Sequence, residues 1–241
     1  MGWVAFDVRR KNMAEPLFEI IDKILRPAAV AQIGGFRPED SVLSWFGGNF
    51  TAHPTDPWPE LNGLAAVPLL QVKCAELPFM PKHLVGVDIL QVFSAADSLP
   101  IDLPASNGEG FLVREFSPDV AAPATDAPPF DFLKPFQIRW HEGASEGPTW
   151  EEAYYHLPDD IVRAYVETDD PFGRYYDRYE RHATTKIGGW ASYIQGIVKP
   201  EEEYVLQIGS EEKPNWMVGD NGNMYLYRKE DGTWIMNWDC Y

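Results

Sequence analysis

Two short stretches, far apart in the chain, share one pattern of residue types. They read SWFGG at residues 44–48 and TKIGG at residues 185–189: a small hydroxyl residue, a large side chain, an apolar residue and two adjacent glycines. Adjacent glycines allow positive φ or a close backbone approach where a strand bends or bulges. The question is whether this pattern arose by chance or whether one unit was built twice.

The segments that follow the two glycine pairs also correspond. LLQV, which contains Gln71, follows the first pair, and VLQI, which contains Gln207, follows the second. An aromatic-ended strand comes next in each case, at Phe93 and at Tyr227. Because three elements recur in the same order at similar spacing, the sequence indicates an internal duplication. Each half is expected to be a small β-unit whose apolar face packs on the other half.

The fold class follows from this duplication and from the frequent chain breaks. The 21 prolines and 19 glycines favour short strands and long loops. We predict an α+β fold, mainly antiparallel sheet built from two pseudo-repeated β-units, in a single domain over residues 1–241. An amphipathic N-terminal helix is expected at about 14–25, repeat one at about 43–95, a helical and loop insertion at about 97–183, and repeat two at about 184–241. Within the insertion, Pro158 is expected to divide residues 150–167 into two short helices.

The acidic charge restricts the partners that the protein can have. The formal net charge is -17, from 37 acidic and 20 basic residues, so the chain should repel nucleic-acid backbones and attract basic surfaces. The charge can also serve solubility alone, which leaves both interpretations open. Cys74 and Cys240 show no CxxC spacing, and no apolar run is long enough to cross a bilayer. We therefore expect a cytoplasmic protein with no direct nucleic-acid or membrane contact.

No motif in the sequence indicates catalysis. The five histidines form no zinc-like spacing, and no GxSxG, GxGxxG or GxxxxGK[ST] motif is present. The segment around Asp220 and Gly222 lacks the spacing of a calcium loop and is typical of a tight turn. We therefore expect a protein that is not an enzyme and that uses no metal or cofactor.

Residues 150–181 alternate acids with aromatic residues. Tyrosines can anchor a protein interface while carboxylates attract a basic partner, although the same tyrosines can instead pack in the core. The candidate partner-binding residues are Glu151, Glu152, Tyr154, Tyr155, Asp159, Asp160, Asp169, Asp170, Tyr175 and Tyr176.

The order of several weak motifs resembles the YwqG-like domain-of-unknown-function family of bacteria. The resemblance runs from about residue 43 to 241 and rests on SWFGG, LLQV, KIGG, YIQ, LQI, GDNG and the terminal WDCY. Where the family commonly has lysine before the first glycine pair, this chain has Trp45, and only the second copy keeps it, as Lys186. The family-motif residues, expected to be structural, are Gly47, Gly48, Gln71, Lys186, Gly188, Gly189, Gln207, Asp220 and Gly222.

The resemblance implies an α+β fold and gives no catalytic residue. Members of the family are often associated with bacterial toxin loci, where an immunity protein neutralises a toxin by binding it. The first hypothesis is therefore a non-enzymatic immunity protein, an antitoxin that binds a cognate basic toxin, such as a nuclease. The alternative is a small-molecule or peptide binder, or a hydrolase, that uses a cleft between the two β-units lined by Lys186, Gln71 and Gln207.

Overall fold

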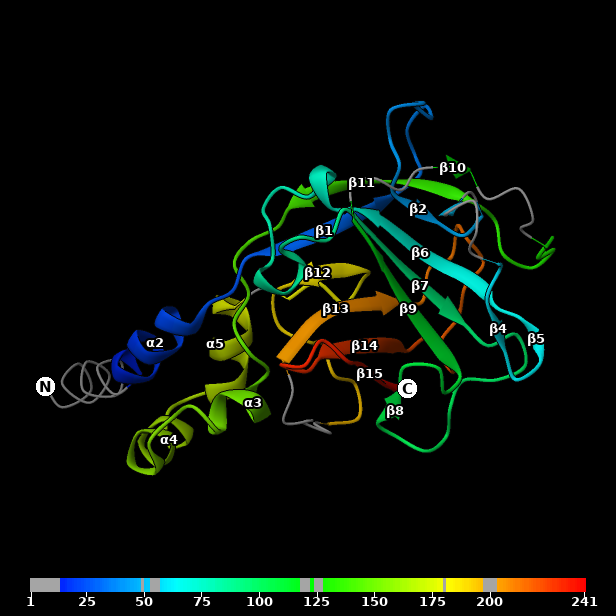
Figure 1. The fold of residues 1–241 in the computed structure, drawn as a ribbon. Coiled ribbons are helices and arrows are strands. Elements are labelled where there is room, and N and C mark those ends of the chain that lie inside the picture. The colour runs from blue at the N-terminus through cyan, green and yellow to red at the C-terminus, as the bar shows by residue number, and fades with distance from the viewer. Residues whose placement is uncertain are drawn as a thin grey trace, which may run out of the picture.

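The fold was analysed in a computed structural model, which describes residues 14–48, 50–52, 57–117, 122–123, 128–179, 181–196 and 203–241. One large sheet curves around a core, and the helices gather at one end of it (Figure 1). The helices are α2 (Glu15–Ile21), α3 (Trp150–Tyr154), α4 (Asp159–Val166) and α5 (Pro171–Arg178). Short 3-10 turns lie at Asp22–Ile24, Cys74–Glu76 and Lys82–Leu84.

The large sheet has 11 strands in the order β8-β15-β14-β13-β12-β1-β11-β2-β6-β7-β9, and every pairing in it is antiparallel. The predicted α+β fold dominated by antiparallel sheet is thus confirmed. One half, called half one, contains β2 (Trp45–Phe46), β6 (Val67–Lys73), β7 (Ile89–Ser94), β9 (Phe111–Phe116) and β11 (Phe136–Glu142). Half two contains β1 (Ala28–Ile33), β12 (Lys186–Gly188), β13 (Glu203–Gly209), β14 (Asn223–Arg228), β15 (Trp234–Asp239) and β8 (Ala105–Ser106).

Two small two-stranded sheets lie outside the large one. Strand β10 (Ala122–Pro123) pairs with β3 (Thr51–Ala52), and β4 (Glu60–Leu61) pairs with β5 (Leu64–Ala65). The β4–β5 hairpin belongs to the segment that links the first glycine pair to β6.

The strand register shows that the two glycine-pair motifs occupy equivalent positions. Trp45 pairs with Gln71 in half one, and Lys186 pairs with Gln207 in half two. Each half also has a register shift at the same place, between Pro68 and Leu70 in β6 and between Tyr204 and Leu206 in β13. The correspondence indicated by the sequence is therefore present in the backbone pairing.

The correspondence extends further than the repeats at 43–95 and 184–241. Residue Gln137 of β11 pairs with Trp45, and Val30 of β1 pairs with Lys186, so β1 and β11 are equivalent strands. They pair with each other at the centre of the sheet, where Gln32 lies opposite Arg139. Strand β1 comes before repeat one in the sequence but belongs to half two, and β11 comes before repeat two but belongs to half one. The region 97–183, predicted as a helical and loop insertion, also supplies β8, β9 and β11 to the sheet.

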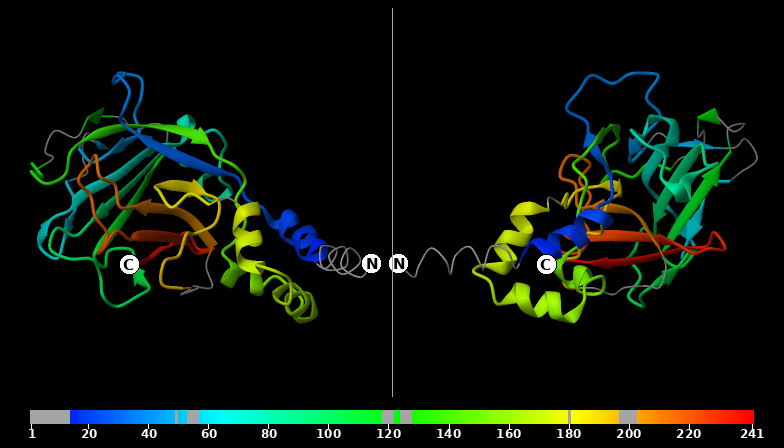
Figure 2. Two further views of the ribbon diagram at one scale, coloured as in Figure 1. Left: turned by 180° about the vertical axis from the view of Figure 1, so that it is seen from behind. Right: turned by 90° about the vertical axis from the view of Figure 1, so that its left-hand side faces the viewer.

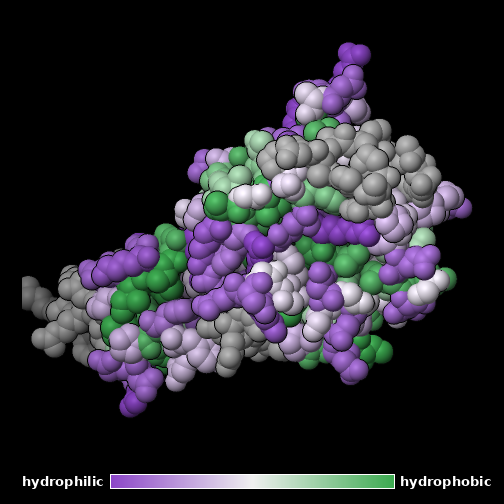
Figure 3. All heavy atoms as spheres, in the orientation of Figure 1, coloured by the Kyte–Doolittle hydropathy of each residue, from purple (hydrophilic) through white to green (hydrophobic). Residues whose placement is uncertain are grey.

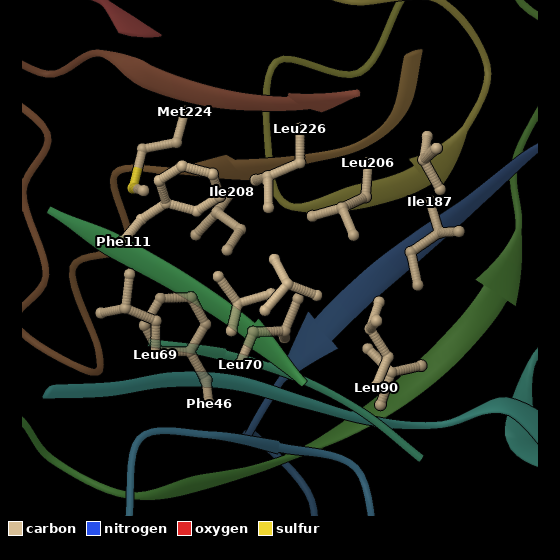
Figure 4. Packing of buried hydrophobic residues seen from close by; sticks show 14 of the residues in the cluster. Phe46, Leu69, Leu70, Leu90, Phe111, Ile187, Leu206, Ile208, Met224 and Leu226 are labelled. Atoms are coloured by element: carbon tan, nitrogen blue, oxygen red, sulfur yellow. The ribbon is translucent and has the colours of Figure 1, made fainter. Parts of the chain in front are cut away.

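The apolar faces of the two halves pack on each other. Figure 4 shows Phe46, Leu69, Leu70, Leu90 and Phe111 facing side chains of half two, and all of the labelled residues are almost completely buried. The half-two side chains are Ile187, Leu206, Ile208, Met224 and Leu226. Because alternate side chains of a strand point to opposite faces of a sheet, the apolar positions of both halves meet in one core.

The helices form a second, smaller core beside the sheet, as both views of Figure 2 show. Helix α2 has proline in its first turn and buries Leu17, Phe18 and Ile21, although it ends at Ile21, before the predicted limit of 25. Helix α3 ends at Tyr154 and α4 begins after Pro158, so the predicted division at this proline is confirmed. Thr149 and Glu152 form a capping box at the start of α3.

A buried glutamine in each half fixes the loop that follows the glycine pair. The side chain of Gln71 accepts from the backbone N–H of Thr51 (2.7 Å) and donates to the carbonyl of Leu43 (2.8 Å). Gln207 makes the same two bonds, with the N–H of Ser192 (2.9 Å) and the carbonyl of Thr184 (3.0 Å). The intervening glycines Gly47, Gly48, Gly188 and Gly189 all have positive φ, which explains why the motif requires two of them.

Replacing either glutamine with leucine should therefore destabilise the fold. Each Gln71→Leu or Gln207→Leu variant leaves a backbone N–H and a carbonyl without their partners, at a cost of about 1–3 kcal/mol for each buried group. Urea denaturation measures the change in unfolding free energy. The exposed Gln32→Leu is the matched control, expected to change stability by less than about 0.5 kcal/mol. Losses no larger than that of the control would show that these bonds do not hold the loops.

Candidate functional site

A cavity of about 440 Å³ lies on the outer face of half two, opposite the core between the halves. Its walls come from the second glycine pair, strands β13 and β14, helix α3, the segment 79–83 and the residues just before β1. Five of the lining side chains are aromatic: Phe79, Trp190, Tyr193, Tyr204 and Tyr227. Six others are ionisable: Arg26, Lys82, His83, Glu152, His156 and Glu203. Largely apolar walls with a few polar groups are typical of small-molecule sites.

The corresponding surface of half one is filled by its own side chains. Phe93 occupies the position equivalent to Tyr227, because Gln91 and Tyr225 lie opposite the two equivalent glutamines. The ring of Phe93 packs edge-on against Phe50 (5.2 Å between ring centres) and Trp58 (5.6 Å). Leu61 and Ala66, from the β4–β5 hairpin region, complete this cluster. Half one therefore fills with its own side chains the surface on which half two leaves part of the cavity wall.

The charged groups of the cavity differ in how they are compensated. Lys82 and His83 both contact the carboxylate of Glu203, and these contacts hold the pKa of Glu203 below its usual range. The guanidinium of Arg26 lies flat over the ring of Trp190, with its central carbon 3.6 Å from the ring centre. Burial lowers the pKa of Arg26, and the nearby Glu152 and Glu203 oppose that shift. Arg26 is an exposed residue by accessible surface, and its guanidinium is held against an aromatic wall of the cavity.

The tyrosine hydroxyls provide the neutral polar groups of the cavity. The hydroxyls of Tyr193 and Tyr227 are hydrogen-bonded to each other at 2.6 Å. The hydroxyl of Tyr204 is buried and has no hydrogen-bond partner among the described residues. Burial raises the pKa of all three phenols, so they are protonated at neutral pH.

Lys186 lies beneath the cavity and is completely buried in an ion pair with Glu146. Its ammonium donates to both carboxylate oxygens of Glu146 (2.9 and 2.7 Å) and to the hydroxyl of Ser192 (3.0 Å). Burial lowers the pKa of Lys186 to about 8, and the carboxylate of Glu146 opposes this shift. A buried charge pair of this kind needs complete hydrogen bonding to persist, and here the carboxylate has it.

Glu146 connects this ion pair to two residues of the cavity wall. Its carboxylate accepts from the backbone N–H of Trp190 (2.9 Å) and of His182 (2.8 Å). Its backbone exchanges two hydrogen bonds with Arg26 (3.0 and 2.8 Å). The carboxylate also lies against Gly189, where a Cβ atom would come within 2.2 Å of it. Lys186 thus supports the cavity from below, whereas the equivalent Trp45 packs with the aromatic cluster of half one.

The predicted cleft between the β-units, lined by Lys186, Gln71 and Gln207, is not formed by these residues. All three side chains are 0% exposed, and all are held by hydrogen bonds to their own half or to Glu146. The two halves meet through large apolar side chains, which fill the space where this cleft was expected. These three residues therefore do not line a cleft, although the segment 79–83 of repeat one does border the cavity beside half two.

The ten candidate partner-binding residues separate into two groups. Glu152 is buried in the capping box, and Tyr175 is completely buried with its hydroxyl bonded to the carbonyl of Pro148 (3.0 Å). Neither can anchor a partner at the surface. The other eight are exposed on or beside α3, α4 and α5: Glu151, Tyr154, Tyr155, Asp159, Asp160, Asp169, Asp170 and Tyr176. Figure 3 shows hydrophilic and hydrophobic groups mixed over this end of the molecule.

The remaining motif residues shape a turn. Asp220 is exposed and its carbonyl accepts from the N–H of Tyr241 (3.0 Å). A Cβ atom on Gly222 would lie 1.9 Å from the carbonyl oxygen of Asp239, so only glycine fits against the terminal strand. Within the described ranges, no group of three or more histidine, cysteine, aspartate or glutamate side chains is placed to hold a metal ion.

The described helices contain none that is long and apolar enough to cross a bilayer. Both cysteines are free thiols, with Cys74 buried and Cys240 partly buried. Burial raises the pKa of Cys74 to about 12, which makes it a poor nucleophile.

Together the fold and the cavity define a duplicated α+β protein in which one half carries an aromatic-lined site. Residues 44–240 match the family described as Domain of unknown function (DUF1963), so the chain belongs to this family. The match begins at the serine of SWFGG and ends within WDCY, the motifs at the two ends of the duplicated region. A search of curated proteins found no match to the chain.

The sequence singled out few residues of the cavity: Gly188 and Gly189 as motif glycines, Glu152 as a candidate partner-binding residue and Tyr227 as the end of a repeated strand. Arg26, Phe79 and Tyr204 come from segments with no recognisable motif. The sequence contained one indication of where the cavity lies. Trp58 and the β4–β5 hairpin, which cover the outer face of half one, have no counterpart in the sequence after TKIGG.

Removing the buried ammonium should strongly destabilise the protein. Lys186→Met leaves the carboxylate of Glu146 buried without a counter-charge, at an expected cost of about 3–5 kcal/mol in unfolding free energy. Adding Glu146→Gln should recover much of this loss, since an amide oxygen still accepts from a backbone N–H. Denaturant titration of the single and double variants measures both effects.

Lys82→Met provides the control, because the Lys82–Glu203 pair is exposed (71% and 54% of the side chains) and should contribute at most about 1 kcal/mol. A Lys186→Met loss equal to that of Lys82→Met would show that the buried pair does not support the fold.

Proposed function

We propose that this protein is a non-enzymatic binding protein whose ligand is a small molecule held in the cavity of half two. The observation that carries the proposal is the asymmetry between the halves. In half one the aromatic strand position Phe93 is covered by Phe50 and Trp58. In half two the equivalent Tyr227 is also buried, with its ring edge-on to Tyr204 (6.0 Å between ring centres), but it borders a cavity of about 440 Å³. Protein interiors are normally close-packed, as the outer face of half one is. The unfilled space beside half two is therefore the place where a ligand can bind.

The wall chemistry supports binding in this cavity. Aromatic rings contribute apolar contact area, while Arg26, Glu152 and Glu203 provide charges that can orient a ligand. The buried Lys186–Glu146 pair fixes the backbone on which Arg26 and Trp190 stand, so the walls are formed before a ligand arrives. A preformed site loses little conformational entropy on binding.

A thermal-shift screen against a metabolite collection tests this proposal. A ligand at 100 times its dissociation constant should stabilise the native state by about 2.7 kcal/mol and raise Tm accordingly. His156→Trp adds bulk to the cavity lining and should weaken any true ligand at least about tenfold. Tyr155→Trp, at the adjacent exposed position outside the lining, should leave affinity unchanged. If no compound stabilises the protein, or if both variants behave alike, the cavity is not a ligand site.

The exposed acids and tyrosines of α3–α5 support a second candidate function, binding of a basic protein. Tyr154, Tyr155 and Tyr176 are 50%, 66% and 39% exposed, which is unusual for large aromatic side chains. Asp159, Asp160 and Asp169 are exposed in the same helical region and would attract a positive surface. The YwqG-like resemblance, with its frequent association with bacterial toxin loci, makes the proposed partner a cognate toxin, and the protein a cytoplasmic immunity protein. The free thiols are compatible with a reducing compartment.

Co-expression with the toxin of a neighbouring gene tests this second function. The native protein should protect cells, and Asp159→Lys with Asp160→Lys and Asp169→Lys should slow association and weaken binding about tenfold or more, with a strong salt dependence. Asp170 stays unchanged because it caps α5 through the N–H of Gly173. Glu60→Lys with Asp102→Lys and Glu142→Lys makes the same charge change at exposed positions elsewhere. Equal effects of the two triple variants, or no protection by the native protein, would contradict this function.

A further inference from the structure

We infer that the cavity of half two takes an aromatic carboxylate: a flat ring among the aromatic side chains, with its carboxylate on Arg26. This inference rests on the proposed function and names the chemistry of the ligand. Two independent observations carry it, one on the ring and one on the anion.

An aromatic ring in the ligand is indicated by the packing of Trp58 on the equivalent surface of half one. There the indole of Trp58 packs on Phe93 with ring centres 5.6 Å apart and planes at 89°, and its Nε1 donates to the carbonyl of Ala66 (2.9 Å). In half two the ring of Tyr227 takes the place of Phe93 and already packs edge-on against Tyr204 (6.0 Å between ring centres). The rings of Phe79, Trp190 and Tyr193 line the space that remains beside this pair. Edge-to-face packing of this kind favours a planar aromatic ligand. The protein thus contains its own example of a ring bound at this strand position.

An anionic group in the ligand is indicated by the contacts of the Arg26 guanidinium. Its guanidinium stacks on Trp190, and no described residue accepts a hydrogen bond from it. The guanidinium group is planar and contacts Trp190 through its face. Its N–H groups point outward in the guanidinium plane and remain able to donate. Two parallel N–H groups match the two oxygens of a carboxylate. The other basic residues of the cavity, Lys82 and His83, already contact Glu203, so Arg26 is the group that an anion would meet.

The surrounding acids limit the charge of that anion. Glu152 and Glu203 act on Arg26 strongly enough to oppose the fall of its pKa. The same carboxylates would repel a dianion more than a monoanion. A single carboxylate is therefore favoured over a phosphate ester, and the apolar walls favour an acid with a ring over a short aliphatic acid.

Isothermal titration calorimetry with four probes tests the assignment. Indoleacetate carries both the ring and the carboxylate, indoleacetamide is its neutral counterpart, tryptamine is cationic, and acetate lacks the ring. Indoleacetate is expected to bind about tenfold or more tightly than each of the others, since a charge-assisted hydrogen bond discriminates by at least that factor. Phenyl phosphate, with a ring and a dianion, should also bind more weakly than indoleacetate.

Variants of Arg26 assign the effect to its guanidinium. Arg26→Gln should abolish the preference for indoleacetate over indoleacetamide, and Arg26→Lys should keep part of it, because lysine retains the charge without the fork. Arg163→Gln, at an exposed position on α4, makes the same charge change away from the cavity and should leave the preference intact. The thermal midpoint of each variant confirms that it is folded.

The outcomes separate this inference from the proposed function. Tight binding of indoleacetamide or tryptamine, or a preference that survives Arg26→Gln, would overturn the carboxylate while keeping a ligand site. Binding of non-aromatic compounds alone would overturn the ring. Failure of every compound in the broad screen would remove the ligand site and this inference together.

Discussion

The fold depends on the burial of one apolar face of each half against the other. Neither set of strands can hide its apolar side chains alone, because an isolated sheet leaves one face in water. Phe46 and Leu70 of half one meet Ile187 and Leu206 of half two in one core. Phe46 lies opposite Leu70 on neighbouring strands, and Ile187 lies opposite Leu206 in the same way, so the two pairs are equivalent. The glycine pairs turn the chain out of each short strand, and the buried glutamines hold the loops that result. Reciprocal use of β1 and β11 ties the halves together, so the two units cannot separate as independent domains.

With the core provided by both halves, their outer faces are free to differ. Half one covers its outer face with Trp58 and the β4–β5 hairpin. Half two leaves a cavity there, and the buried Lys186–Glu146 pair fixes the backbone of two wall residues. The replacement of lysine by Trp45 fits this division: in half one the position contributes apolar packing, and in half two it holds a carboxylate that organises a site.

The sequence was informative where a residue type has one physical use. Paired glycines with positive φ and a proline between two helical segments both predicted their structural roles. The predictions from sequence were wrong where a side chain can be stable either at the surface or in the interior. Tyr175 and Glu152 share the composition of an acidic and aromatic surface, yet one lies in the helical core and the other caps α3. Lys186 and the two glutamines were expected in a cleft because polar side chains usually face solvent, but partners from distant segments satisfy them in the interior.

The sequence by itself determined the duplication, the antiparallel α+β class and the positions of most strands, because these follow from local periodicity and from glycine and proline geometry. Only the tertiary structure decided which strands pair across the halves and where the cavity lies. Arg26, Phe79, Trp190 and Tyr204 come from four separate segments, and their proximity is set by the packing of β1, α3 and β13 around one another. No local pattern encodes such proximity, since it depends on which distant surfaces exclude water together.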